Sequence, residues 1–335
     1  MSRQTANQDL KKYRRVVKTV SYDKHVFSSY LVKGDIHSAL HYLEGFPEND
    51  DLVDKYHHVF VGNNNLTRSK DELINALDQI YQQYYRDVFW HKKRIVDAES
   101  RLFSSLWTFC GEDESYPKDS QIEEKVESIV REQGYAFLGG CTAGYYGPYI
   151  WEKSTKETYE VELPSGIETY SVIMMDGFVS NSWLDFISFG KVSTGGWIGD
   201  DGTLCCIKSL YNLESKAFSI SFLKHEAQHG YDKRLFPNIT STELEYRAKL
   251  VELIYWEDEK IIMSFHREAE SCDEKNSHAL ASHRLICDLS RKLFDCDYET
   301  DILLFSSKLD EIRIVAKELL QNDTKRLNLH KENQS

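Results

Sequence analysis

The sequence is most informative at His225-Glu226-Ala227-Gln228-His229, which follows a largely apolar run over residues 217–224. On an α-helix, residues four apart lie one above the other, so both imidazoles would project from one face toward a single metal ion. Glu226 would lie close enough to reach a water molecule on that ion. The flanks contain no proline and carry apolar groups where a buried helix needs them, at Ile220, Phe222, Leu223 and Ala227. We therefore expect a buried helix that carries a metal site.

Two histidines leave such a site short of a protein ligand, so a third must come from elsewhere in the chain. In metzincins a third histidine lies six residues after the second, and a glycine lies three after it. Here these two positions hold Leu235 and Asp232. The chain therefore does not follow the metzincin pattern.

A second helix is expected over residues 241–254. Pro237 and Asn238 end the previous helix, and the hydroxyl run from Thr240 to Thr242 supplies an N-cap. Apolar residues then recur at helical spacing, at Leu244, Ala248, Val251 and Tyr255. This segment is the nearest source of a further ligand.

Three glutamates on this helix compete for the role of third ligand. Glu245 has the small residue Ala248 three positions on, which would let the helix approach the histidines closely. Glu243 is also placed to cap the helix, and Glu252 lies on the same face two turns along. We prefer Glu245 because only it has the small neighbour.

With this second helix the sequence resembles the gluzincins, zinc metallopeptidases in which HExxH is followed by a glutamate ligand in an ExxA motif. His225, Glu226 and His229 match the first motif, and residues 245–248 match the second. The resemblance covers roughly thirty residues and identifies no subfamily. It implies one zinc ion per chain, held by His225, His229 and Glu245.

The resemblance also implies a reaction. Zinc would lower the pKa of a bound water to roughly neutral. Glu226 would take the proton, and the hydroxide would attack a peptide carbonyl before Glu226 returns the proton to the leaving amine. We expect Asp232 to accept a hydrogen bond from a ligand imidazole and Ala248 to leave room beside the metal. The oxyanion donor stays open among Tyr255, His266, His278 and His283.

Composition narrows the class of protein. The chain has 335 residues, 41% of them hydrophobic, which is enough for one large domain or two modest ones. Its net charge of −13 argues against nucleic acid and anionic membranes as partners. The resemblance to gluzincins implies a protein or peptide substrate. Seven scattered cysteines without C-x-x-C spacing favour reduced thiols. Because no signal peptide or membrane span is visible, we expect a cytoplasmic protein, although export without a cleavable signal would leave no trace. The oligomeric state stays open.

The predicted fold class is α+β, mainly helical, with a mixed or antiparallel sheet before the metal helix. We expect a helical N-terminal region over 1–118, a zincin-like metallopeptidase domain over 119–322 and a frayed polar tail over 323–335. The N-terminal region should open with a basic amphipathic helix up to residue 24. A short helix from Asp35 and one long helix over 69–103, without internal glycine or proline, should follow.

The sheet should contain strands at 159–163, 168–175 and 184–189, and a hairpin over 196–207 that turns at 200–202. Helices are expected at 257–269, 277–294 and 306–320. In gluzincins the edge strand of such a sheet pairs with the extended substrate, but spacing does not reveal which strand is the edge.

Three alternatives stay open. The first is a zincin-fold binding module that has lost peptidase activity, and the second is a protein whose histidines bind no metal. The third is a hydrolase of a non-peptide amide, since peptide deformylases combine HExxH with an upstream cysteine ligand, for which Cys141 and Cys205 are candidates. The chain length and the acidic ligand downstream argue against that family.

Overall fold

The computed structural model describes residues 21–111, 121–199, 201–269 and 276–332. The expected basic helix before residue 24 and most of the acidic loop near residue 115 lie outside these ranges. The chain divides into two compact units, Met1–Lys118 with Trp183–Val192, and Asp119–Ser182 with Ser193–Ser335. The sequence-based division placed residues 183–192 in the catalytic part, whereas by contacts they belong to the first unit.

The first unit is helical. Its elements are α1 (Lys24–Val32), α2 (Ile36–Leu43), η2 (Pro47–Asn49), α3 (Asp50–Tyr56), η3 (His57–Val61), α4 (Glu72–Tyr85), η4 (Arg86–Trp90) and α5 (Ile95–Phe109). The predicted helix after Asp35 is confirmed, because the Asp35 side chain accepts a hydrogen bond from the amide of Ser38 and caps α2.

The prediction of one long helix over 69–103 is wrong. The chain turns at Lys92, which adopts a left-handed conformation with φ of 50°. Lys93 stabilises this turn, because its Nζ lies 2.7 Å from the carboxylate of the buried residue Asp87 and its amide donates to the Asp87 carbonyl. A turn without glycine or proline has no clear sequence signal. The helical spacing of apolar residues therefore predicted that the helix continues.

The predicted strand at 184–189 is also wrong. This stretch is α7 (Ser182–Ser188), and it packs within the first unit. Tyr56 donates a hydrogen bond to the carbonyl of Ile187, and Arg68 forms an ion pair with Asp185 at 3.1 Å. A short apolar run fits a buried strand and a buried helix equally well, which is why its pattern was misleading.

The second unit contains a curved mixed sheet. It begins with α6 (Gln121–Glu132), and the strands are β1 (Ala136–Leu138), β4 (Tyr149–Leu163), β5 (Gly166–Asn181), β6 (Gly196–Ile198) and β7 (Leu204–Ile207), in the order β1-β4-β5-β7-β6. β5 and β7 are parallel and the other pairs are antiparallel. The strands β2 (Cys141–Thr142) and β3 (Tyr145–Tyr146) form a separate pair. The predicted 196–207 hairpin is confirmed, and the strands at 159–163 and 168–175 are parts of longer ones. β6 therefore forms one edge of the sheet.

Helices make up the rest of the second unit: η5 (Lys208–Leu210), η6 (Ala217–Lys224), α8 (His225–Leu235), α9 (Ser241–Tyr255), α10 (Lys260–Ala269), α11 (Ser277–Phe294), α12 (Ile302–Ser306) and α13 (Leu309–Glu332). The mixed α+β class is thus confirmed. The prediction of a frayed tail from residue 323 is wrong, because α13 continues to Glu332 and Asp323 is buried in ion pairs with Arg247 and Arg284. Polar residues in this stretch thus form buried ion pairs.

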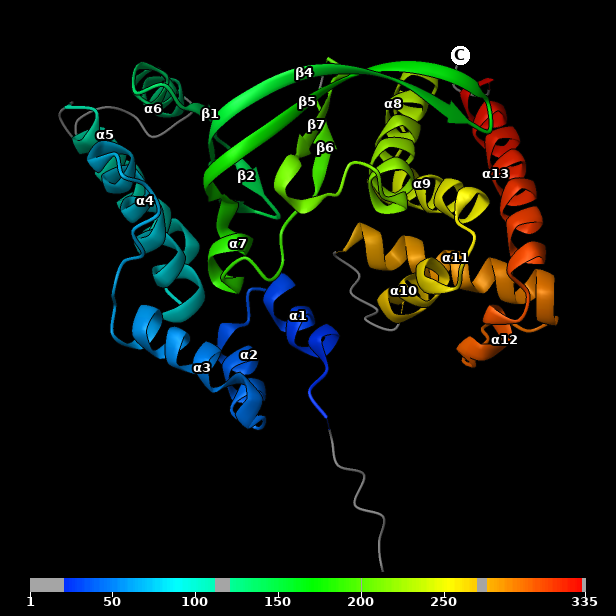
Figure 1. Cartoon of the computed structure of the whole chain (residues 1–335), viewed down its shortest axis with the longest axis horizontal. Helices are drawn as coiled ribbons and strands as arrows, with labels where there is room; N and C mark the ends of the chain where they lie inside the picture. The colour runs from blue at the N-terminus through cyan, green and yellow to red at the C-terminus, as the bar shows by residue number, and fades with distance from the viewer. Residues whose placement is uncertain (1–20, 112–120, 200, 270–275, 333–335) are drawn as a thin grey trace, which may run out of the picture. The chain divides into compact units, whose positions relative to one another are not determined.

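The helix α8 lies beside the sheet (Figure 1) and contacts β5 and β6. Tyr170 of β5 donates a hydrogen bond of 2.8 Å to the carbonyl of Ala227 in α8. A Cβ atom built on Gly230 would come within 2.8 Å of Ile198 in β6 and 2.9 Å of Tyr170. The absence of a side chain at Gly230 therefore allows the histidine-bearing helix to pack against the edge strand.

Gly230→Ala should destabilise the protein by about 1–3 kcal/mol, since the added methyl overpacks this contact. The same change in an open helix position would stabilise by up to about 1 kcal/mol. Denaturant unfolding measures the difference, with Lys233→Ala on the exposed side of α8 as the control. A Gly230→Ala variant as stable as wild type would contradict the close packing.

Candidate metal centre

The segment before the histidines is a π-helix, η6, that continues directly into α8. The amide of His225 donates to the carbonyl of Ile220, five residues back. The expected apolar residues are buried here, at Ile220, Phe222, Leu223 and Ala227. π-helical turns are rare and occur frequently at functional sites. The π-helical turn ends directly before His225, so it helps to set the orientation of this side chain.

α8 and α9 bring His225, His229 and Glu245 together. The two imidazole rings lie 4.6 Å apart between centroids, both largely buried. Nε2 of His225 lies 3.4 Å from Oε2 of Glu245, and Nε2 of His229 lies 3.4 Å from Oε1. One carboxylate thus faces both histidines at equal distance, as the sequence-based hypothesis of a shared ligand set requires.

The spacing of these atoms fits a small divalent cation. A tetrahedral ion with bonds of about 2.0–2.1 Å requires neighbouring ligand atoms to lie roughly 3.3 Å apart. In addition, Oε2 of Glu245 is buried, and its nearest polar neighbours are imidazole nitrogens, Nδ1 of His278 at 2.9 Å and Nε2 of His225 at 3.4 Å. Two imidazoles and a carboxylate are a donor set that suits zinc. The residues present therefore fit the metal that the sequence predicts.

The electrostatics of the centre also favour a cation. Burial would raise the pKa of the Glu245 carboxyl, but the imidazoles of His225, His229 and His278 hold it well below its usual range. Burial would likewise lower the pKa of His225, yet contacts with Glu245 and Glu252 raise it to about 10. Buried carboxylates thus hold positive charge strongly at this point.

Glu226 lies beside the ligand set. One side-chain ligand atom from each of His225, Glu226 and His229 lies within 4.8 Å of the other two. Glu226 is partly exposed, and among the described residues its carboxylate makes no hydrogen bond or ion pair. An unengaged carboxylate at this position is available to exchange a proton.

Glu252 supports His225 from the other side of its ring. Its Oε1 lies 2.7 Å from Nδ1 of His225, and its side chain is buried. This contact leaves Nε2 of the ring directed toward Glu245. A carboxylate on the far nitrogen orients a metal-binding histidine and makes it a better donor. Glu252, considered a rival ligand from sequence, thus orients the imidazole of His225.

Asp232 does not take its expected role. Both of its oxygens accept hydrogen bonds from Arg247, and one also accepts from Gln228. Asp232 was expected to accept from a ligand imidazole, but Nδ1 of His229 has no hydrogen-bond partner among the described residues, and Nδ1 of His225 contacts Glu252. Sequence reasoning missed Arg247, although a cation on the apolar side of the helix that carries Glu245 was a visible signal.

The remaining candidates separate clearly. Glu243 caps α9, since its carboxylate accepts from the amide of Thr240 and the Thr240 hydroxyl accepts from the amide of Glu243. Ala248 is fully buried in the same helix, consistent with close packing there. Cys141 and Cys205 do not belong to the His225 group, and burial raises the pKa of the Cys205 thiol to about 11.

Of the four side chains considered as oxyanion donors, only His278 contacts the centre. Its Nδ1 lies 2.9 Å from Oε2 of Glu245, at the start of α11, and its side chain is half exposed. His266 contacts the carbonyl of Glu299 and His283 stacks on Tyr298. The ring of Tyr255 is covered by the ammonium group of Lys224.

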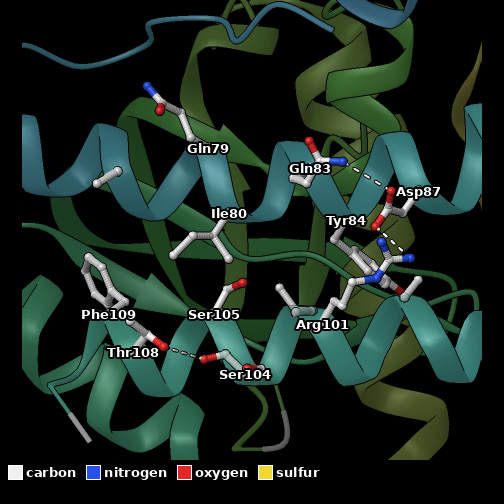
Figure 2. Close-up of a pocket in the computed structure, with 13 residues that line it drawn as sticks. Gln79, Ile80, Gln83, Tyr84, Asp87, Arg101, Ser104, Ser105, Thr108 and Phe109 are labelled. Carbon is white, nitrogen blue, oxygen red and sulfur yellow. Dashed lines mark hydrogen bonds and ion pairs between the residues drawn. The ribbon is translucent and has the colours of Figure 1, made fainter. Parts of the chain in front are cut away.

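A separate pocket of about 670 Å³ lies between α4 and α5 of the first unit (Figure 2). Gln83 of α4, Asp87 of η4 and Arg101 of α5 line it. Asp87 is already paired with Lys93 and Arg101. None of the residues proposed for the metal centre lines this pocket.

Comparison of the chain with protein-family models, curated proteins and solved structures finds no match. Across the described ranges, no helix combines the length and apolarity needed to cross a membrane. Functional inference therefore depends on the geometry of the centre itself.

Glu252→Gln should weaken zinc binding about 10–100-fold, because the neutral amide orients His225 less firmly and makes it a poorer donor. Competition with a chromophoric chelator measures the dissociation constant. Glu259→Gln, on an exposed glutamate that contacts neither histidine, should bind zinc as wild type does. A larger loss of zinc affinity in the control than in Glu252→Gln would show that Glu252 does not support the centre.

Proposed function

We propose that this protein is a zinc-dependent peptidase with a zincin-like second unit. In this proposal His225, His229 and Glu245 hold one zinc ion, and Glu226 is the general base. The single observation that carries it is the Glu245 carboxylate, 3.4 Å from Nε2 of both histidines. Catalytic zinc sites typically have three protein ligands, whereas structural sites have four.

Each side chain has a stated task in the reaction. Zinc, when bound, supplies a Lewis acid that polarises a peptide carbonyl and acidifies water. The Glu226 carboxylate accepts a proton from the attacking water and delivers it to the nitrogen of the leaving amine. Glu252 keeps the His225 ring in place during these steps through its contact with Nδ1.

The substrate in this proposal is a protein or peptide in extended conformation. β6 is an edge strand of the sheet, and its residue Ile198 packs against Gly230, directly after His229. An extended segment that pairs with the open side of β6 would lie along α8. Main-chain pairing provides affinity with little selection for side chains.

Glu226→Gln should retain zinc and lose peptide hydrolysis by about 10²–10⁴-fold, because the amide cannot accept the proton. Elemental analysis of purified protein and proteome-wide cleavage mapping test both halves of this expectation. Glu259→Gln, on an exposed residue before α10, is the matched control. An active Glu226→Gln variant would remove the general base, and zinc without turnover in wild type would favour the binding-module alternative.

His278 is assigned as the oxyanion donor, since it alone among the four candidates contacts Glu245. His278→Ala should lower kcat by about 10²–10³-fold while KM changes little, because the interaction forms in the transition state. Steady-state kinetics on a cleavable peptide measure both constants. Comparable loss in His283→Ala would argue against this assignment.

A further inference from the structure

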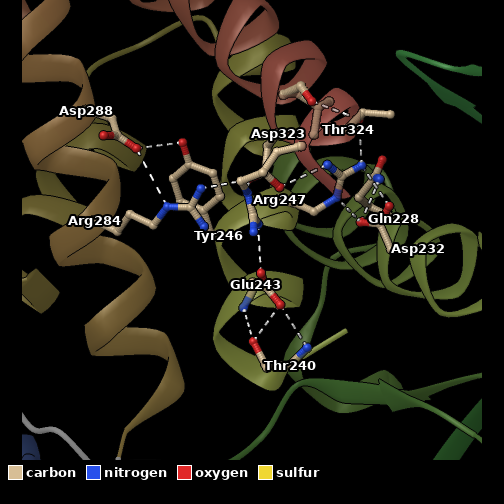
Figure 3. Close-up of polar contacts among 12 residues, drawn as sticks. Gln228, Asp232, Thr240, Glu243, Tyr246, Arg247, Arg284, Asp288, Asp323 and Thr324 are labelled. Carbon is tan, nitrogen blue, oxygen red and sulfur yellow. Dashed lines mark hydrogen bonds and ion pairs between the residues drawn. The ribbon is translucent and has the colours of Figure 1, made fainter. Parts of the chain in front are cut away.

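Arg247 makes a fork of hydrogen bonds inside the second unit (Figure 3). Its side chain is 1% exposed, and Nε and Nη2 donate to the two oxygens of Asp232, both at 2.9 Å. Nη1 donates to Asp323 at 3.2 Å, and Nη2 also donates to Thr324 at 3.1 Å. The guanidinium thus joins α9 to α8 on one side and to α13 on the other.

The fork lies next to the metal centre along both helices. Arg247 is two residues after Glu245 on α9, and Asp232 is three residues after His229 on α8. At about 1.5 Å of rise per residue, each partner is within roughly 3–5 Å of a ligand along its helix axis. A slide or rotation of α8 that separated the imidazoles from Glu245 would also break the fork.

A two-bond contact fixes direction as well as distance. A bidentate guanidinium and carboxylate resist sliding and twisting, whereas a lysine at the same place would act as a point charge. Gln228, the residue before His229, also donates a hydrogen bond of 2.9 Å to Oδ2 of Asp232. The partner on α8 is therefore itself held in one orientation.

The far end of the fork is anchored as firmly. Asp323 accepts from Arg284 of α11 at 2.6 Å and from Arg326 of α13 at 3.0 Å. Arg326 also contacts Glu243, in the first turn of α9, at 2.7 Å. These cations lower the pKa of Asp323, against the effect of its burial, so it stays ionised. Arg247 consequently has little freedom to follow a displaced α8.

We infer that Arg247 is a positioning residue for the metal centre: through Asp232 it holds α8 in register with α9, so that His225 and His229 meet Glu245. This inference rests on the metal site of the proposed function. It predicts that replacing Arg247 weakens metal binding more than replacing another buried cation on the same helix does.

The chain offers a matched control on the same helix. Lys249, two residues after Arg247, is also a buried cation, 4% exposed, with its Nζ 2.6 Å from Glu268. Glu268 lies on α10 and also accepts from Ser282 of α11. Lys249 therefore connects α9 to α10 and α11, and within the described part of the chain it forms no hydrogen bond or ion pair with α8. Its replacement measures the general cost of removing a buried ion pair.

The experiment compares Arg247→Met, Arg247→Lys and Lys249→Met with wild type in the full chain. Thermal unfolding of metal-free protein measures stability, and chelator competition at a temperature where every variant is folded measures the dissociation constant for Zn²⁺. Both methionine variants should unfold at lower temperature. Arg247→Met and Arg247→Lys should bind zinc about 10–100-fold more weakly, whereas Lys249→Met should stay within about twofold of wild type.

Arg247→Lys keeps the charge, so it remains informative if Arg247→Met does not fold. Asp232→Asn should weaken zinc binding to a similar degree, and combining it with Arg247→Lys should add little, since both act through one contact. Unchanged affinity in the folded Arg247 variants, or an equal loss in Lys249→Met, would overturn the inference alone. Wild type that takes up no divalent metal would overturn the proposed function as well.

Discussion

The second unit is organised around one contact, the carboxylate of Glu245 facing two imidazoles from the neighbouring helix. Bringing those groups together in a buried place is unfavourable unless their charges are compensated. Gly230 lets α8 pack against the sheet, and Ala248 is fully buried in α9. Without that closeness the three side chains would not share one point in space.

The acidic residues around this contact have different roles. Glu252 orients His225, Asp232 binds Arg247, and Glu243 caps α9. Only Glu226 is left without a hydrogen bond or ion pair among the described residues at the centre. Carboxylates of similar chemistry thus differ in function because their partners differ, and the free one is the one expected to move protons.

Local patterns predicted the parts of this site that depend on helix periodicity. The four-residue spacing of His225 and His229 and the capping box at Thr240 act within single helices, so both were visible in sequence. Other features depend on contacts between distant segments. The partner of Asp232 is fifteen residues away and that of Asp323 seventy-six, so neither ion pair leaves a periodic trace. The turn at Lys92 escaped for a different reason, because a non-glycine residue adopts a left-handed conformation there.

The path of the chain between the two units has a consequence for biosynthesis. It passes from one unit to the other after Lys118, Ser182 and Val192. The first unit therefore lacks α7 until residue 192 has left the ribosome, by which time β1 to β5 have already been made. Domains usually fold in the order in which they emerge. Here the first unit cannot be completed before residues of the second unit have been synthesised.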